Sequence, residues 1–572
     1  MVDQDFVQDN SILGKDPLHM SELPLKRVPD YMRKRGGFMY WTGALISVAF
    51  IYQIISGLIL LLYYNPASAY NSTEAIIETI PYGALILTSH LYGAYAMIVL
   101  IYVHMFRNYF MGAYKKPRIL QWISGVILLA TTIGVGFFGY SMTGDVLSSD
   151  ATDVGRGIAE AVPFLGKTFE SIFFGNGTSV SLFAHMLAWH IILVLVIGAI
   201  FGLHFFLAEA NGIMPSNRVS KHKAPAVDKE DPNYKPWNPY NFAYMIQLGM
   251  IALGIIIIVP SVMILLPSVP TLFSPFPQVS SSSVFAAFVP TYPPWFLLFV
   301  YKAIDFTFLA ADGAYEALAA TVVFAVIPLV YFIAVPFIDR SNDLHPLARP
   351  LVTSFGILSI IYLAILSLWG ALAPGIPISD SIVAAVLVPP FVIVVGGMYF
   401  LNRQYVKGKF KVSPNRILTS FLIFLLLLCF TFITLSENIG TLMTYGNGIN
   451  ILATLFAGGA TAFAAVGTMK SAQFSYKVKP KVETKNAYQL SKNTAMVLTS
   501  IISVSAIAIV VIIAKLNPVS IPQEGVFGIG LGIILVLAGI VLRIYRANMG
   551  FFNELTNVAR DVQASRNSPF SS

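Results

Sequence analysis

The chain has 572 residues and a net charge of +8; 56% of its residues are hydrophobic and only 11% are charged. Soluble domains carry about 25% charged residues, so this composition, with a mean hydropathy of +0.72, excludes an ordinary soluble protein and indicates a polytopic membrane protein. The one cysteine, Cys429, excludes an intramolecular disulfide and any Cys-x-x-Cys-His cofactor attachment.

Apolar stretches long enough to cross a membrane as helices, about 20 residues each, recur along the whole chain. The predicted fold class is therefore an all-α polytopic membrane protein with about 12 transmembrane helices. The predicted spans are residues 39–64, 83–106, 119–140, 182–207, 243–266, 317–337, 351–373, 382–401, 417–435, 447–468, 495–514 and 525–542.

The distribution of positive residues predicts the orientation of these spans. With the N-terminus placed inside, 32 of the 36 Lys and Arg residues fall in inner segments. The outer loops then hold Arg156, Lys167, Lys302 and Lys515. Because positive residues favour the cytoplasmic side, we expect a multi-pass protein of the cell (plasma) membrane with both termini in the cytoplasm.

Histidines are the only ionisable residues inside the predicted spans: His90 and His104 in the second, and His185, His190 and His204 in the fourth. His90 and His104 are fourteen residues apart, and so are His190 and His204. Fourteen residues rise roughly 21 Å in an α-helix and end about 40° short of four full turns, so both histidines of a pair face nearly the same way. Since the two spans run parallel, the pattern predicts two bis-imidazole clamps stacked across the membrane, a geometry for two haems.

Glycines repeat this spacing on the neighbouring spans. Gly43 and Gly57 are fourteen residues apart in the first predicted span, and Gly125 and Gly139 are fourteen apart in the third. A flat macrocycle can approach the backbone where glycine leaves room, although glycine is also common in membrane helix contacts generally. The matched spacing favours a four-helix bundle in which two helices ligate and two make room.

Several short segments extend the pattern beyond the histidines. They are the His90-to-His104 stretch, Arg107, Lys115-Lys116-Pro117-Arg118, Gly139-Tyr140-Ser141, Trp189-His190, His204, Pro293-Pro294-Trp295-Phe296 and Val335-Pro336-Phe337-Ile338. Together they resemble the cytochrome b subunit of bc-type quinol-oxidising complexes, most of all its split form from photosynthetic membranes. The resemblance covers residues 30–375 and gives no assignment for the last five predicted spans.

The resemblance implies which histidines share a haem. His90 with His190 would hold an outer, low-potential haem, and His104 with His204 an inner, high-potential one. Parallel helices and the charge-derived orientation require the same pairing. The haems are expected to be b-type; the alternative is the A-type haem of some thermoacidophilic archaea, whose Pro-Pro-Trp-Phe variant this sequence resembles.

Three residues near the inner end have open alternatives. Arg107 and Arg118 are candidates for charge-assisted hydrogen bonds to the propionates of the inner haem, or they are ordinary positive-inside residues. Glu209 stands where a family histidine often binds quinone. It is either a proton relay of an inner quinone site or an inner-surface charge.

The resemblance also implies an outer quinol site. This site would combine the end of the third span with the Pro293–Tyr301 stretch, which lies much later in the chain. The usual family motif there is Pro-Glu-Trp-Tyr, whose glutamate is thought to take a quinol proton. This chain has Pro294 instead, which cannot accept a proton. Asp145 and Tyr301 match a family aspartate and tyrosine and are alternative acceptors. The expected site residues are Tyr140, Asp145, Pro293, Trp295 and Tyr301.

The leading interpretation is an electron-transfer subunit of a respiratory complex, and thus a membrane oxidoreductase. Quinol would be oxidised near the outer face, with one electron passing to a Rieske iron–sulfur protein and the other crossing two haems to a quinone near the inner face. The archaeal variant implies a supercomplex with a haem–copper oxidase, and the family implies a dimer. Membrane lipid surrounds the chain, and no nucleic-acid partner is expected.

A secondary transporter is the alternative from another class, with the histidines as structural residues. Twelve spans is a common transporter count. Transporters usually place charged residues or broken helices at the membrane midplane, whereas the predicted spans contain no acid or base other than histidine.

Three sections are predicted along the chain. Residues 1–213 would form a di-haem domain of four spans. Residues 214–375 would form a C-terminal cytochrome b-like domain of three spans with the outer quinol motif. Residues 376–572 would form an extension of five further spans.

Overall fold

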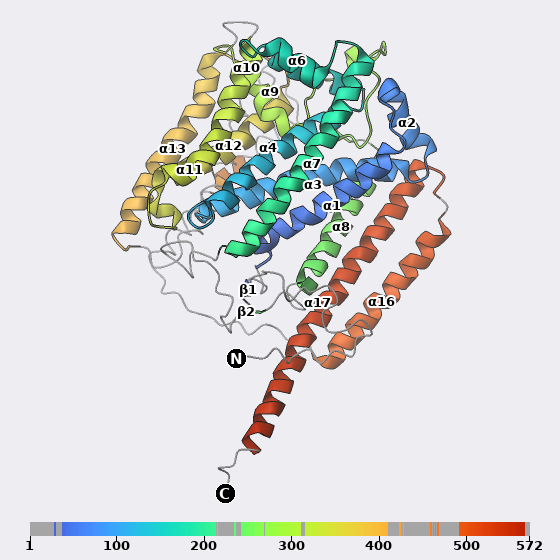
Figure 1. Ribbon diagram of the computed structural model, residues 1–572, viewed down its shortest axis with the longest axis vertical. Coiled ribbons are helices and arrows are strands. Elements are labelled where there is room, and N and C mark those ends of the chain that lie inside the picture. The colour runs from blue at the N-terminus through green and yellow to red at the C-terminus, as the bar shows by residue number, and fades with distance from the viewer. Residues whose placement is uncertain are drawn as a thin grey trace.

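The computed structural model is an all-α membrane protein (Figure 1). It describes residues 37–212, 242–267, 269–309, 315–409, 491–516 and 518–566, with short pieces at 28–29, 214, 234–235 and between 423 and 467. Within these residues ten helical segments are long and apolar enough to cross a membrane: Met39–Leu61, Gly83–Phe110, Ile119–Ser141, Ser179–Asn211, Phe242–Leu265, Glu316–Ile338, Pro350–Leu372, Asp380–Val406, Asn493–Lys515 and Ile521–Ile544.

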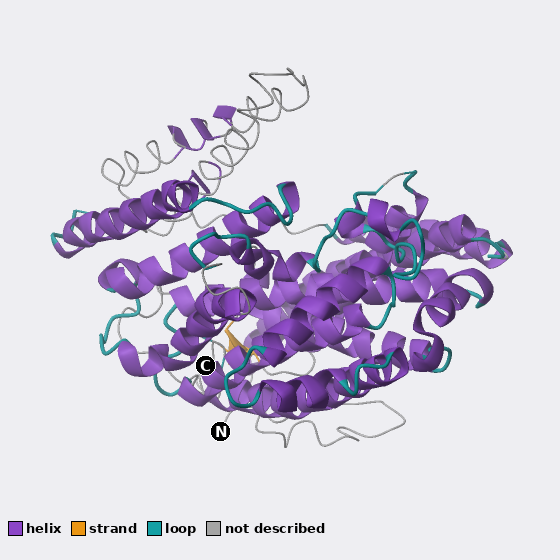
Figure 2. Cartoon of the chain, turned by 90° about the horizontal axis from the view of Figure 1, so that it is seen from above, coloured by secondary structure: helices purple, strands orange, loops and turns teal. Residues whose placement is uncertain are grey.

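These spans confirm the predicted fold class, and each coincides with one of the predicted apolar stretches. The two other predicted spans, 417–435 and 447–468, lie almost entirely outside the described residues, and Cys429 lies outside them too. Strand is confined, in the described part of the chain, to a two-residue antiparallel pair between β1 (Val28–Pro29) and β2 (Tyr234–Lys235), visible in Figure 2.

Four long helices form the N-terminal bundle: α1 (Thr42–Leu61), α3 (Gly83–Phe110), α4 (Ile119–Ser141) and α7 (Ser179–Asn211). Helix α1 packs against α3, and α4 packs against α7 (Figure 1). Helix α7 starts after Thr178, whose hydroxyl accepts a hydrogen bond from Ser181 N at 3.3 Å and so satisfies one of the free N–H groups of the first turn.

Shorter helices lie between the spans at the end of the bundle where α4 finishes. They are α2 (Ala69–Thr79), α5 (Val146–Glu160), α6 (Gly166–Phe174) and α9 (Leu298–Ile304). All four are shorter than a membrane span, and α5 carries its buried side chains on one face, so these helices cover the end of the bundle rather than cross the membrane.

The remaining helices are α8 (Phe242–Leu265), α10 (Glu316–Thr321), α11 (Ile327–Ile338), α12 (Pro350–Leu372), α13 (Asp380–Val406), α16 (Lys492–Lys515) and α17 (Ile521–Arg566). A π-helical turn, Val322–Val326, joins α10 to α11 just before Pro328, a residue without a backbone N–H. Aromatic side chains join α11 to the bundle, because Trp122 Nε1 donates to Phe332 O at 2.6 Å and the Tyr109 ring lies 5.2 Å from that of Phe332.

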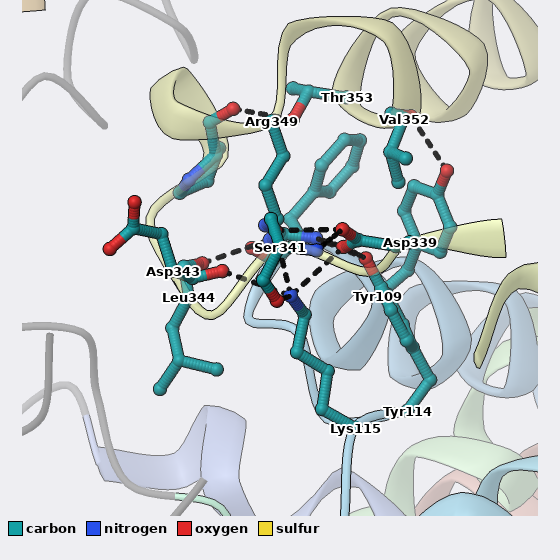
Figure 3. Close-up of polar contacts among 12 residues, drawn as sticks. Tyr109, Tyr114, Lys115, Asp339, Ser341, Asp343, Leu344, Arg349, Val352 and Thr353 are labelled. Atoms are coloured by element: carbon teal, nitrogen blue, oxygen red, sulfur yellow. Dashed lines mark hydrogen bonds and ion pairs between the residues drawn. The ribbon is translucent and has the colours of Figure 1, made fainter. Parts of the chain in front are cut away.

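One polar cluster ties the loop after α3 to the loop between α11 and α12 (Figure 3). Asp339 accepts a hydrogen bond from Tyr114 Oη at 2.5 Å and lies 3.2 Å from Lys115 Nζ and 3.3 Å from Arg349 Nη1. Burial alone would raise the pKa of Asp339, but the hydrogen bonds from Tyr114 and Ser341 and the two cations lower it below its usual value. The cluster therefore fixes the end of α3 by charged, buried contacts that no apolar pattern predicts.

Helices α16 and α17 belong to the C-terminal extension, and α17 packs along α8 on the flank of the bundle (Figure 1). The span Ile521–Ile544 is only the first half of α17, which continues as helix to Arg566. The predicted span 525–542 begins after Glu524, whereas the structure places Glu524 inside the helix and buries it.

Candidate functional site

The two central helices carry the four paired histidines at matching heights. His90 and His104 lie on α3, and His190 and His204 lie on α7. The ring centroids of His90 and His190 are 6.5 Å apart, and those of His104 and His204 are 6.4 Å apart. The structure thus brings together the same two pairs that the sequence spacing predicts.

These separations fit two imidazoles that share one metal ion. A metal–imidazole bond is about 2.0 Å, and the ligating nitrogen lies about 1.1 Å from the ring centroid, so trans ligands have centroids about 6.3 Å apart. Within the described residues no group of three or more His, Cys, Asp or Glu side chains could hold a metal ion. Each pair therefore suits a metal whose other ligands come from a macrocycle.

Hydrogen bonds at Nδ1 orient three of the rings through hydroxyl side chains. Ser56 Oγ lies 2.8 Å from Nδ1 of His90, and Thr42 Oγ1 lies 2.8 Å from Nδ1 of His104. Ser124 Oγ lies 3.1 Å from Nδ1 of His204. Such bonds leave Nε2 as the ligating nitrogen and fix the plane of the ring, which is the usual arrangement of ligating histidines.

The fourth ring, that of His190, uses a backbone partner instead. Its Nδ1 lies 3.0 Å from Val135 O. A sequence signal exists for the other three partners, since Thr42, Ser56 and Ser124 each directly precede one of the paired glycines. The fourth glycine is preceded by Phe138, which has no hydroxyl. The backbone carbonyl of Val135 in α4 bonds to the ring of His190 in place of a hydroxyl. Sequence reasoning missed these orienting residues.

The four glycines face the imidazoles directly. A Cβ atom on Gly57 would lie 3.1 Å from Cε1 of His90, and one on Gly139 would lie 2.8 Å from Cε1 of His190. At the inner level the corresponding distances are 3.4 Å from Gly43 to His104 and 3.0 Å from Gly125 to His204. The glycines make room for the rings themselves, and room for a macrocycle stays a prediction.

The pair His104 and His204 opens into a cavity with about 1140 Å³ of space between its atoms, part of it open to the surface. The predicted residues that line it are Gly43, His104, Arg107, Arg118, Gly125, His204 and Glu209. The amide nitrogen of Asn108 lies 3.2 Å from Nε2 of His104, so metal binding there requires Asn108 to turn aside.

The two arginines of this cavity are held differently. Arg118 is 1% exposed, and its guanidinium donates to Asn211 O at 2.8 Å and to Gly212 O at 3.1 Å, the carbonyls that end α7. Burial lowers the pKa of Arg118 to about 10, so the side chain keeps its charge at neutral pH. Arg107 lies 4.4 Å over the Tyr40 ring and donates to Asn108 Oδ1 at 3.0 Å.

The Pro-Pro-Trp-Phe segment lies against the bundle near the end that holds His90 and His190. Phe296 is buried, and a Cβ on Gly136 of α4 would lie 3.1 Å from its ring. Trp295 packs edge-on against Tyr95 of α3 with centroids 5.7 Å apart. Among the described residues, Trp295 Nε1 is a buried donor without a hydrogen-bond partner, so this indole N–H is available to a bound molecule.

Asp145 and Tyr301 both make structural contacts with α5. The Asp145 carboxylate accepts from Ser148 N at 2.9 Å and from Gln278 N at 2.7 Å, which caps α5 and holds the segment before Pro293. Tyr301 Oη donates to Ala151 O at 2.9 Å, and burial raises the pKa of Tyr301 above its usual value. Tyr140 lies in the last turn of α4 beside this region and is half-buried.

A four-helix bundle with two facing imidazole pairs defines a bis-histidine membrane cytochrome class of protein. A family profile described as "Cytochrome b(N-terminal)/b6/petB" matches residues 95–280. Cytochrome b of Sulfolobus acidocaldarius is 42% identical over 398 residues, covering 67% of this chain and 69% of that protein. The chain therefore belongs to the cytochrome b family.

Two further relatives place it in respiratory complexes. The cytochrome b subunit of the Bacillus subtilis menaquinol:cytochrome c reductase is 34% identical over 181 residues, covering 31% of this chain and 81% of that subunit. A solved structure titled "Hyperthermophilic respiratory Complex III" superimposes with a TM-score of 0.50 at 25% identity, covering 66% of this chain and 92% of the other. The chain is a multi-pass cytochrome b of a respiratory bc-type complex, a family that carries haem b.

Proposed function

We propose that the chain binds two haems, one at each histidine pair, and oxidises quinol near the end of the bundle that holds His90 and His190. The observation that carries the proposal is the pair of centroid distances, 6.5 and 6.4 Å, which would let the two imidazoles of each pair hold one haem iron between them. When bound, the haems supply one-electron redox chemistry. The chain supplies their ligands, their separation and an apolar surrounding.

The orienting hydrogen bonds support this role. An imidazole whose Nδ1 is already bonded presents Nε2 to the bundle interior in one fixed plane. Ser56 provides such a bond to His90 of one pair, and Thr42 and Ser124 provide them to both rings of the other pair. The glycines let the rings approach the helices. In the predicted orientation, His104 and His204 lie toward the cytoplasm, where Arg107 is placed to meet haem propionates.

For the outer quinol site we propose Trp295 as a hydrogen-bond donor, with Pro293 and Tyr140 as walls. The buried indole N–H of Trp295 has no hydrogen-bond partner among the described residues, and the Trp295 ring packs against Tyr95. Asp145 remains the proposed proton acceptor in place of the glutamate that Pro294 replaces, and Tyr301, whose raised pKa keeps its hydroxyl protonated, is proposed as a relay that passes a proton on. Both already hold α5 in position, so they would act from a fixed geometry.

An inner quinone site is proposed beside the inner pair, with Glu209 as its proton relay. Glu209 lines the same cavity as His104 and His204. The guanidinium of Arg118 already donates to the carbonyls that end α7. We therefore assign the propionate contact to Arg107 rather than to both arginines.

The proposed partners follow from the family. They are a Rieske iron–sulfur protein as first acceptor, a second copy of the chain, and, in the archaeal variant with an A-type haem, a haem–copper oxidase. The three predicted sections, 1–213, 214–375 and 376–572, are retained as the proposed domain organisation. The comparisons above lend no support to a secondary transporter, because each names cytochrome b or Complex III.

Quinol-dependent reduction of the purified complex tests this function. A short-chain quinol is added without oxygen, and haem reduction is followed by visible absorption. Trp295→Phe keeps an aromatic side chain, although a smaller one, and removes the N–H, so the KM for quinol should rise about 5- to 10-fold with unchanged haem spectra. Trp189→Phe is the matched control, because its N–H is bonded to Ile172 O at 2.8 Å.

The two parts of the proposal fail separately in this experiment. A wild-type complex that quinol does not reduce would contradict quinol oxidation. An unchanged KM in Trp295→Phe would remove only Trp295 from the site.

A further inference from the structure

The N-terminus of helix α3 has no cap of its own. The residue before the helix, Tyr82, has a left-handed backbone (φ 62°) and makes no side-chain capping bond. The first four N–H groups of a helix have no partner within the helix, and a buried helix end needs one from elsewhere. Helix α3 is also the helix that carries His90 and His104.

The missing cap comes from the C-terminal extension, 439 residues further along the chain. Glu524 of α17 is 5% exposed, and its Oε2 accepts a hydrogen bond from Leu85 N at 2.9 Å. The backbone N–H groups of Tyr82 and Ala84 interact with the same carboxylate. A carboxylate at this end also complements the positive end of the α3 dipole.

A tight glycine seam fixes α17 lengthwise on its neighbours. A Cβ on Gly532 would lie 2.5 Å from Ile258 of α8, and one on Gly539 would lie 2.6 Å from Ile251. A Cβ on Gly528 would lie 2.6 Å from Leu85, the residue that Glu524 caps. Close contact without side chains leaves α17 little freedom to slide, so the height of Glu524 relative to α3 is set by packing.

The cap acts on a short, rigid path to the outer histidine pair. His90 follows Leu85 by five residues on the same helix, a rise of roughly 7.5 Å. A helix end whose N–H groups lose their acceptor frays within its first turn, and His90 lies one turn beyond it, at the end of the second turn. His104 lies about 21 Å further along the helix and is shielded from such fraying.

We infer that Glu524 is a positioning residue for the outer histidine pair, and that α17 acts as a built-in clamp that holds α3 at the height where His90 faces His190. The inference rests on the proposed function in one respect, that a haem binds at this pair. The N-terminal family profile matches the chain only as far as residue 280. The inference gives α17, which lies beyond that match, a structural role at the N-terminal bundle.

The test compares Glu524→Ala with Glu524→Gln in the full chain, using two measurements that do not depend on turnover. Hydrogen exchange at the Leu85 amide should be about tenfold faster in Glu524→Ala, because one hydrogen bond to a charged group is lost. Haem content and redox titration should show loss or a shifted potential of the outer haem with the inner haem unchanged. Glu524→Gln keeps an acceptor oxygen and should restore most of both.

Gln523→Ala is the matched control from the same turn of α17. Its side chain accepts from Val519 N at 3.0 Å, just before the start of its own helix, so both haems should stay as in wild type. Should Glu524→Ala fail to accumulate, Glu524→Asp shortens the side chain by one methylene and gives the same comparison.

The outcomes separate the inference from the proposed function. Equal loss of both haems would overturn the positioning role of Glu524. So would a Glu524→Ala variant in which neither the haems nor the exchange rate of the Leu85 amide changes. A wild-type protein without a haem at the outer pair would overturn the proposed function instead, while faster Leu85 exchange in Glu524→Ala would still support the cap.

Discussion

Ser56 Oγ lies 2.8 Å from Nδ1 of His90, and Ser56 directly precedes Gly57, whose missing side chain makes room for the same ring. Two consecutive residues of α1 thus orient and accommodate one ligand. The dipeptides Thr42-Gly43 and Ser124-Gly125 repeat the arrangement for His104 and His204. This pairing of a hydroxyl with a glycine gives each level of the bundle its own testable contacts.

Removing the Ser56 hydroxyl should weaken the outer level alone. Loss of such an orienting partner typically costs about 10- to 100-fold in metal affinity. We expect Ser56→Ala to release the outer haem faster, measured by transfer to a haem-scavenging apoprotein. Ser124→Ala should have the same effect on the inner haem only, and faster loss of the wrong haem in either variant would contradict the assignment.

The glycine contacts predict opposite outcomes for two equivalent substitutions. A Cβ on Gly139 would lie 2.8 Å from Cε1 of His190, closer than real contacts allow, whereas a Cβ on Gly43 would lie at 3.4 Å from His104. We expect Gly139→Ala to displace the His190 ring and abolish low-spin outer haem absorption. Gly43→Ala should keep the inner haem, and equal tolerance of both substitutions would show that the contacts do not limit ligation.

Relocated proton acceptance is tested at Asp145 and Tyr301. A working acid–base group contributes about 100-fold or more to rate. The Asp145→Asn, Tyr301→Phe double variant should therefore oxidise quinol about 100-fold more slowly, assayed with the partner complex present. Single variants report whether each group acts alone. Near-wild-type turnover of the double variant would leave water or a partner subunit as the acceptor.

Acid should weaken the packing of α13 on the loop between α11 and α12 through His345. The Nδ1 atom of His345 accepts from Leu347 N at 3.2 Å, and its ring stacks on Tyr405 with centroids 4.6 Å apart. Burial and then Arg349 lower the pKa of His345 from 6.5 to about 4. The unfolded histidine takes up its proton first, so this contribution to stability is present above pH 6.5 and is lost as the pH falls toward 4.

Thermal unfolding of wild type and His345→Gln across that range measures the effect. The wild-type melting temperature should fall as the pH is lowered from 6.5 to 4, and the variant should show a smaller fall over the same interval. Parallel curves for the two proteins would exclude His345 as the source.

The ligand pairs are predictable from the sequence because a helix converts spacing into direction. Fourteen residues return a side chain to nearly the same face, and because the two spans run parallel, the matched spacing pairs His90 with His190 and His104 with His204. Apolar length likewise predicts the ten spans that the structure describes. Both signals are local and periodic.

Contacts between distant segments cannot be predicted in this way. Glu524 reaches Leu85 across 439 residues, and Asp339 meets Tyr114 across 225. Neither contact leaves a periodic trace in the sequence. The motif around Asp145 predicts a proton acceptor, but the capping of α5 and the bond to Gln278 N depend on how a loop folds back, which spacing alone does not determine.

Haem stoichiometry combined with ligand replacement tests the central claim most directly. Pyridine haemochrome titration of the purified wild-type chain should give two haems per polypeptide. His104→Ala should give one, with the outer, low-potential haem retained, and His90→Ala should give one with the inner haem retained, because each haem needs both axial bonds. Zero or one haem in the wild type, or loss of the opposite haem in either variant, would contradict the account.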